Sequence, residues 1–322
     1  MQPIGDSTNF SKKNMTNPEK NSSPPFSLTR FAWISIAAAL ITICLKLYAY
    51  WLTNSVGLLS DALESFVNLL TAIVALMALR ISARPADEEF TFGYSKVEFF
   101  SSGFEGAMIL VAAGGIAFTA VQRLLHPQPV EQIGLGLLIS ASASMVNLGV
   151  SRLLARVGKR YDSITLQADA RHLMADVITT GGVIVGVGLV SVTRLVVLDP
   201  IVALLVAVNI LFTGARLLRQ SYHGLMDISL PDPDLAKIQE ILKTYEAQGI
   251  KFHAIRSRSA AAQKFLSMHI LVPGAWSVQH GHKIAEEIES EIRKEFSQIA
   301  IFTHVEPIED PASYKDSLLE KE

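Results

Sequence analysis

Six long apolar stretches dominate the first two thirds of this 322-residue chain. A helix needs about 20 apolar residues to cross the hydrocarbon core of a bilayer, and each stretch reaches that length. Because lipid offers no hydrogen-bonding partners to the backbone, such stretches must form helices, so the sequence predicts a bundle of six transmembrane α-helices. The predicted spans are 31–52, 56–79, 97–125, 133–153, 163–193 and 196–217.

The composition agrees with a membrane protein that also carries soluble segments. Half of the residues are hydrophobic, 18% are charged, and the mean hydropathy is +0.34. The net charge of -2 offers no electrostatic basis for binding nucleic acid. The single cysteine, Cys44, excludes a disulfide or a thiolate metal site within one chain.

Changes in composition divide the chain into four parts. Residues 1–27 are polar, lack the apolar core of a signal peptide, and are predicted to form a disordered tail. The transmembrane domain is expected over 28–220, a soluble domain over 231–310, and a short C-terminal tail over 311–322.

Positive charge predicts the orientation of the spans. Lysine and arginine gather in the terminal segments and in the loops after spans two and four, whereas the opposite loops carry only Arg123 and Arg194. Positively charged loops remain on the cytoplasmic side of a membrane. Both termini are therefore predicted to be cytoplasmic.

Two of the spans carry matching polar stripes. Each stripe places polar residues at a first position, three residues later and seven residues later, which groups them on one face of a helix. The stripes are Asp61, Glu64 and Asn68 in the second span, and Asp169, His172 and Asp176 in the fifth. Ionisable groups are costly inside a membrane, so they indicate a functional site.

The two stripes are expected to meet. Helix rise places Glu64, Asn68, His172 and Asp176 within about 10 to 18 Å of the outer face of the hydrocarbon core. In an antiparallel pair of helices, Asn68 would lie opposite His172, and Glu64 opposite Asp176. Oxygen and nitrogen donors of this kind bind first-row divalent metals. The alternative is a hydrogen-bond network that only joins the two helices.

The residues after 230 have the pattern of a small α+β domain. A helix is expected at 235–248, strands at 251–258 and 264–272, a helix at 278–296 and a strand at 298–307. This αββαβ order predicts a three-stranded sheet with both helices on one face. In the second strand, Leu266, Met268, Ile270 and Val272 would face the core, with His269 on the other side.

Five of the eight histidines lie in this domain. Histidines from neighbouring strands, together with a carboxylate, suit Zn²⁺ or a similar ion, and His304 and Glu306 would project to the same side of the last strand. The spacing alone is weak evidence, because exposed histidines that bind nothing are also common at such positions.

Taken together, these features resemble the cation diffusion facilitator family, over about residues 28–307. The features shared with that family are the six spans, the two stripes, the run Gly93-Tyr94-Ser95-Lys96-Val97-Glu98 after span two, the pair Asp199-Pro200 in the opening of span six, and the histidine-bearing domain. The resemblance implies a homodimeric exporter that exchanges a divalent metal for protons, with a ferredoxin-like cytoplasmic domain.

The resemblance also assigns roles to individual residues. It implies a transport site of Glu64, Asn68, His172 and Asp176. It implies cytoplasmic metal ligands at His253, His269, His282, His304 and Glu306. It further implies a contact between Lys96 and Asp227, where the membrane part meets the cytoplasmic domain.

The chain departs from the family pattern at two places. Zinc-selective members commonly have an aspartate at the position of Asn68, so the chemistry of the transport site is altered here. Some members have a peripheral site of one aspartate and two histidines after span two. Here Asp87 remains, but Phe90 and Tyr94 replace the histidines, so that site is predicted to be absent.

The expected function is therefore secondary active transport and not catalysis. Zinc is the leading cargo, with iron, manganese, cobalt, nickel and cadmium as alternatives, and no prosthetic group is expected. A bacterial inner membrane is the expected location. Two other classes stay open: a metal-responsive membrane sensor, and a membrane metalloenzyme that uses the metal to activate water.

Overall fold

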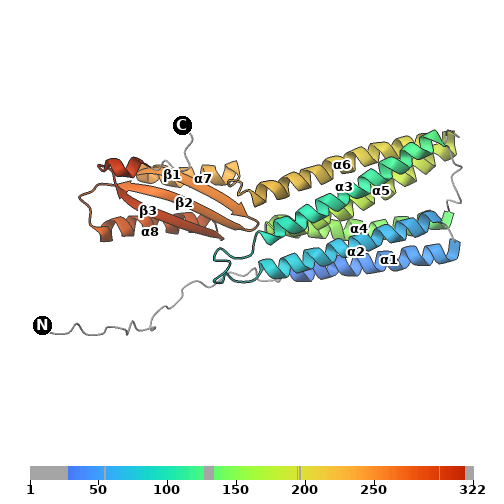
Figure 1. Ribbon diagram of the computed structural model, residues 1–322, viewed down its shortest axis with the longest axis horizontal. Helices are drawn as coiled ribbons and strands as arrows, with labels where there is room; N and C mark the ends of the chain where they lie inside the picture. The colour runs from blue at the N-terminus through green and yellow to red at the C-terminus, as the bar shows by residue number, and fades with distance from the viewer. Residues whose placement is uncertain are drawn as a thin grey trace.

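The computed structural model describes residues 28–53, 56–126, 134–193, 195, 197–296 and 298–315. Within them, the membrane part consists of six long helices that run side by side along the long axis of the molecule (Figure 1). These are α1 Thr29–Thr53, α2 Val56–Ser82, α3 Val97–Leu125, α4 Gly134–Arg160, α5 Ile164–Thr193 and α6 Leu198–Leu225. The predicted N-terminal tail, 1–27, lies outside the described residues.

The six predicted helices are present, and α4 and α6 extend furthest beyond their predicted ends. Helix α4 continues to Arg160 and α6 to Leu225, whereas the apolar pattern ended at 153 and 217. The last turns of these helices are polar, so the apolar pattern does not reveal them. Their backbone groups still form hydrogen bonds by continuing the helix. Among the described residues, four helices are long and apolar enough to span a bilayer: α1, α3, α4 and α6.

Helix α5 lies at the centre of the bundle because it takes part in two separate apolar clusters. On one side, Leu166, Ala170 and Leu173 pack with residues of α1, α2 and α4. On the other side, Ala168 and Ala175 pack with residues of α3 and α6. The polar stripe of α5 therefore faces neighbouring helices and not lipid.

Helices α3 and α6 approach each other closely at a pair of glycines. A Cβ atom on Gly106 would lie only 3.3 Å from the carbonyl oxygen of Gly214 and 3.1 Å from the backbone nitrogen of Leu218. Small residues at such crossings allow the two backbones to come together in membranes. This contact determines which side chains of α3 face α5.

The α/β domain lies at the end of the bundle where α6 ends (Figure 1). It contains α7 Asp232–Glu246, β1 Lys251–Ala260, β2 Gln263–Val272, α8 Val278–Glu295 and β3 Ile299–Pro307. The sheet has the order β1-β2-β3, with β1 antiparallel and β3 parallel to the central strand. The predicted αββαβ order is confirmed.

Both helices of this domain cover the same face of the sheet. Leu266, Met268 and Ile270 of β2 are fully buried and pack with Leu242 of α7 and Ile288 of α8 in one apolar core. The strand alternation leaves the opposite face, with His269, for polar contacts.

The described part of the predicted C-terminal tail contains a short helix. Pro311–Tyr314 forms a 3₁₀ helix, and the side chain of Asp310 caps it by accepting a hydrogen bond from the backbone nitrogen of Ala312 at 2.8 Å. The Ser313 hydroxyl also donates to the carbonyl oxygen of Pro307 at 2.9 Å. Capping and proline at the first turn account for this short helix, which apolar periodicity could not reveal.

Candidate metal centres

Helices α2 and α5 bring three of the four predicted membrane ligands together. The amide nitrogen of Asn68 donates a hydrogen bond to Oδ2 of Asp176, and its carbonyl oxygen lies 2.6 Å from Nε2 of His172. Asn68 and His172 are both 4% exposed. Asn68 therefore contacts both His172 and Asp176 of α5. The sequence had predicted that Glu64 would lie opposite Asp176. The side chain of Glu64 lies outside the described residues.

The hydrogen bonds of this cluster indicate how its atoms are used. Because the carbonyl oxygen of Asn68 can only accept, Nε2 of His172 carries the proton in this arrangement. The other ring nitrogen, Nδ1, has no hydrogen-bond partner among the described residues. The cluster thus presents an imidazole nitrogen, an amide and a carboxylate within one buried site.

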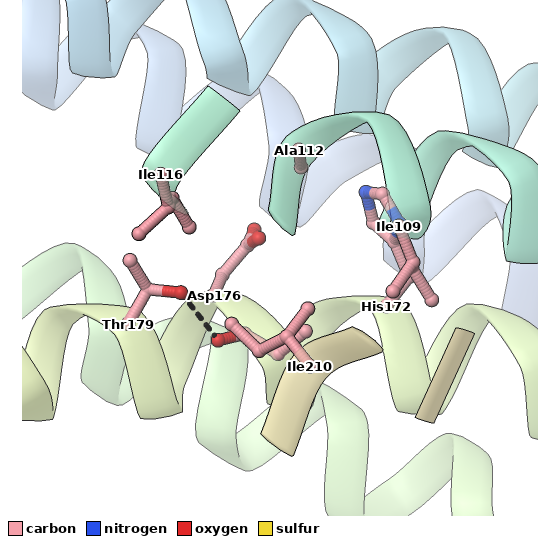
Figure 2. A pocket seen from close by; sticks show the side chains of 8 residues that line it. Ile109, Ala112, Ile116, His172, Asp176, Thr179 and Ile210 are labelled. Carbon is pink, nitrogen blue, oxygen red and sulfur yellow. Dashed lines mark hydrogen bonds between the residues drawn. The ribbon is translucent and has the colours of Figure 1, made fainter. Parts of the chain in front are cut away.

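A small cavity adjoins the cluster on the side of α3 and α6. Its volume is about 10 Å³, which is near the lower limit for a cavity that can hold one water molecule. Figure 2 shows His172 and Asp176 reaching from α5 toward α3, with apolar side chains around them. Thr179 also lines the cavity, but its hydroxyl donates to the carbonyl oxygen of Ala175 at 2.9 Å (Figure 2). Charges interact strongly in such apolar surroundings.

Sequence reasoning missed one residue of this cluster. Asn147 of α4 is 3% exposed, and its amide nitrogen lies 3.4 Å from Oδ2 of Asp176. Its carbonyl oxygen has no hydrogen-bond partner among the described residues. An asparagine inside an apolar span was a signal, and Ser144 and Ser151 complete a polar stripe of the same spacing, but this stripe contains no ionisable group.

Strand register gathers the cytoplasmic histidines. His253 pairs with His269 across β1 and β2, and His269 pairs with His304 across β2 and β3. Oε2 of Glu306 lies 3.0 Å from Nε2 of His253 and 3.1 Å from Nδ1 of His269. One ligand atom from each of these three residues falls within 4.8 Å of the others, a spacing that suits a metal ion.

The other two predicted ligands lie at the border of this cluster. His304 is 66% exposed, and its Nδ1 is 3.5 Å from Oε1 of Glu306. His282 comes from α8 and lines a groove of about 470 Å³, which Glu306 also lines. The structure therefore brings three of the five predicted ligands within metal-binding distance of one another, with His304 beside them and His282 in the adjoining groove.

Replacing His269 and His304 together by alanine is expected to remove about one bound metal ion per chain. His269 is the central donor, because its strand pairs with both neighbours. The measurement is the metal content of the purified full-length protein after dialysis. His280→Ala is the matched control, since its ring packs on Trp276 at 4.2 Å, outside the cluster. Equal metal content in the double variant and in wild type would contradict this ligand assignment.

In the loop after α2, the carboxylate of Asp87 accepts hydrogen bonds from other residues of the same loop. One carboxylate oxygen accepts from the Tyr94 hydroxyl at 2.5 Å, and the other accepts from the backbone nitrogen of Phe90 at 2.7 Å. These bonds, the Tyr94 contact foremost, lower the pKa of Asp87 and raise that of Tyr94. The absence of a metal site here stays a prediction.

The predicted contact between the two domains is present and has a third member. Nζ of Lys96 lies 2.8 Å from Oδ1 of Asp227, and Nη1 of Arg258 lies 3.1 Å from the same oxygen. Although partial burial opposes the shift, the hydrogen bonds from these two cations lower the pKa of Asp227. Its carboxylate therefore stays charged near neutral pH, and the contact is lost only as the pH falls through that lowered pKa.

Aromatic residues extend this contact, and the sequence did not reveal them. The guanidinium of Arg258 lies 4.9 Å from the ring centre of Phe92 and 4.0 Å from that of Phe265. Phe92, from the loop before α3, also meets Phe265 and Phe302 of the sheet edge to face. Only Lys96 and Asp227 had pointed to this junction, because residues from separate segments of the chain meet only in the fold.

Asp227→Asn is expected to lower transport about threefold to tenfold, more than Lys96→Gln or Arg258→Gln does. The change releases both cations, and asparagine keeps the left-handed backbone that Asp227 adopts, with a φ of 56°. Initial rates of metal uptake in vesicles would measure the effect. The double variant Lys96→Gln/Asp227→Asn should be no worse than Asp227→Asn, and additive losses would show that the residues act separately.

Comparison with known proteins extends these observations. Residues 32–226 match the cation efflux transmembrane domain, and residues 230–308 match the cytoplasmic domain of cation efflux proteins. The chain is 51% identical to an uncharacterised transporter of Synechocystis over 88% of its length and 92% of the relative's. It is 29% identical to the cation-efflux pump FieF of Pectobacterium atrosepticum, over 87% of the chain and 93% of the pump.

Proposed function

Because the chain belongs to the cation diffusion facilitator family of divalent metal transporters, an integral membrane class, we propose that it exports Zn²⁺ in exchange for protons. The transport site of this proposal consists of Glu64, Asn68, His172 and Asp176. The observation that carries it is the buried contact of Asn68 with both His172 and Asp176 beside a small cavity.

The donor set supports a divalent first-row metal. An imidazole nitrogen, carboxylate oxygens and an amide oxygen together suit such ions, and affinity order favours zinc over iron and manganese at a generic site. Glu64 and Asp176 would supply two negative charges, which balance one M²⁺ ion. Apolar surroundings make this balance important, because an uncompensated charge inside a membrane is costly.

The arrangement of the domains supports export from the cytoplasm. In this proposal all six helices cross a bacterial inner membrane, with both termini and the α/β domain in the cytoplasm. The cytoplasmic domain would pair two copies of the chain into a homodimer and bind regulatory metal at the histidine cluster. It lies outside the membrane, so it would regulate transport without forming the pathway.

Transport by the purified full-length protein in liposomes tests this function. Vesicles with an acidic lumen would be supplied with external Zn²⁺, Cd²⁺, Fe²⁺, Mn²⁺, Co²⁺ or Ni²⁺, while internal dyes report metal and pH. We expect zinc to enter faster than in protein-free vesicles, with a rise in internal pH. Metal binding without uptake of any of these ions would instead favour a sensor.

A further inference from the structure

A glutamate in the third membrane helix has no evident structural role. Glu105 of α3 is completely buried, and neither carboxylate oxygen has a hydrogen-bond partner among the described residues. The Ser101 hydroxyl lies near the carboxylate, but the two groups do not have the geometry of a hydrogen bond. An ionised carboxylate in such a place is costly, because it has lost water without gaining donors.

Another glutamate of the same helix provides the contrast. Glu98 lies seven residues before Glu105, which places both on one face of α3. Its carboxylate accepts hydrogen bonds from the Ser163 hydroxyl at 2.6 Å and from the backbone nitrogen of Thr165 at 3.3 Å. Glu98 therefore accepts hydrogen bonds from groups at the start of α5 that have no partner within the helix, and these bonds explain its presence structurally. Glu105 has none.

Glu105 lies close to the candidate transport site without forming part of it. It precedes Ile109, which lines the cavity beside His172 and Asp176, by one helical turn, or about 6 Å along the axis. This displacement is toward the end of α3 that faces the α/β domain. Glu105 does not line the cavity, so it is not a candidate ligand of the transported metal.

A second buried carboxylate, on α5, interacts electrostatically with Glu105. Asp169 is 1% exposed, one of its oxygens lacks a hydrogen-bond partner among the described residues, and its charge acts on Glu105. Asp169 in turn interacts electrostatically with His172 and Asp176. No charged group of α6 contributes to the electrostatics of Glu105 within the described residues. On α2, the side chains of Asp61 and Glu64 lie outside the described part of the chain.

The chemistry of this pair favours one kind of occupant. Two neighbouring carboxylates in apolar surroundings cannot both be ionised, so one of them retains a proton. A divalent metal would require further nitrogen or oxygen ligands, whereas a proton requires only one of the two carboxylates. The pair is thus suited to bind a proton between the metal cavity and the cytoplasmic end of the bundle.

We propose that Glu105 is a proton-binding residue of the exchange, holding a proton opposite Asp169 and releasing it to the cytoplasm when metal occupies the site. In this step the O–H bond of Glu105 breaks, its carboxylate keeps the electron pair, and the proton passes to water. The positive charge of the metal favours this release, because a nearby cation stabilises ionised carboxylates. The inference rests on the proposed function and adds to it the carrier of a coupled proton.

Glu105→Gln tests the proposal, because glutamine keeps the shape of the side chain but cannot release a proton. Metal uptake by full-length protein in liposomes would be measured with a neutral lumen and with an acidic one. We expect uptake down a zinc gradient to stay within about threefold of wild type, while acceleration by the acidic lumen is lost. Zinc titrations in two buffers of different ionisation enthalpy should show about one proton fewer released per metal.

Two further variants complete the test. Glu98→Gln is the matched control: it removes a buried carboxylate from the same face of α3, so it should lower thermal stability but leave the response to the acidic lumen unchanged. If Glu105→Gln protein cannot be recovered folded, the same zinc titration is carried out with Asp169→Asn. If Asp169→Asn releases as many protons per bound metal as wild type does, the proposal is overturned.

The outcomes separate this inference from the proposed function. Wild-type protein that transports no metal would overturn both. Wild-type protein that responds to the acidic lumen, together with an equal response and proton count in Glu105→Gln, would overturn the role of Glu105 alone.

Discussion

Asp176→Ala is expected to reduce metal uptake at least about a hundredfold while leaving a folded protein. The carboxylate of Asp176 accepts hydrogen bonds from both Asn68 and Asn147, and it lines the cavity. Its removal takes away one of two negative charges proposed to balance the metal, in surroundings where charge is poorly screened. The measurement is the initial rate of zinc uptake in liposomes, with size-exclusion chromatography to establish folding.

Thr179→Ala is the matched control for this experiment. Thr179 lines the same cavity one turn further along α5, but its hydroxyl donates a hydrogen bond to the carbonyl oxygen of Ala175. Its replacement should therefore leave uptake within about twofold of wild type. Uptake by Asp176→Ala at the wild-type rate would show that the metal does not pass through this site.

Asn68→Asp is expected to tighten metal binding about tenfold or more at alkaline pH and to make binding more dependent on pH. The aspartate would be a further carboxylate beside Asp176, and without metal the two negative groups repel each other. A proton would then bind the pair and must leave when metal enters. Asn68 itself offers an amide oxygen with no titratable proton.

Metal affinities measured against pH for wild type, Asn68→Asp and Asn68→Ala decide the role of this asparagine. Asn68→Ala should weaken binding about tenfold, because it removes an oxygen donor and leaves His172 and Asp176 without their common partner. If the three curves superimpose, Asn68 only joins the two helices by hydrogen bonds. Asn147→Ala is a useful comparison, since its amide reaches the same carboxylate from α4.

The sequence alone determined the local structure of both domains. Apolar stretches of membrane length predicted the six helices, and period-two alternation in β2 predicted which residues enter the core, as Leu266, Met268 and Ile270 do. The stripes of α2 and α5 predicted that Asn68 meets His172. Each of these predictions depends on spacing within one element, which the covalent chain imposes directly. The crossing of the membrane by all six helices stays a prediction.

Apart from the Asn68–His172 and Lys96–Asp227 contacts, which were expected from the sequence, the contacts between separate elements were decided by the tertiary structure. The approach of α3 to α6 at Gly106 and Gly214 and the central place of α5 are matters of helix rotation and packing. They bury Glu105 where it interacts electrostatically with Asp169 and has no hydrogen-bond partner among the described residues, whereas Glu98 on the same face accepts hydrogen bonds. Sequence spacing shows which residues share a face of one helix, but the partner across that face depends on how several helices pack.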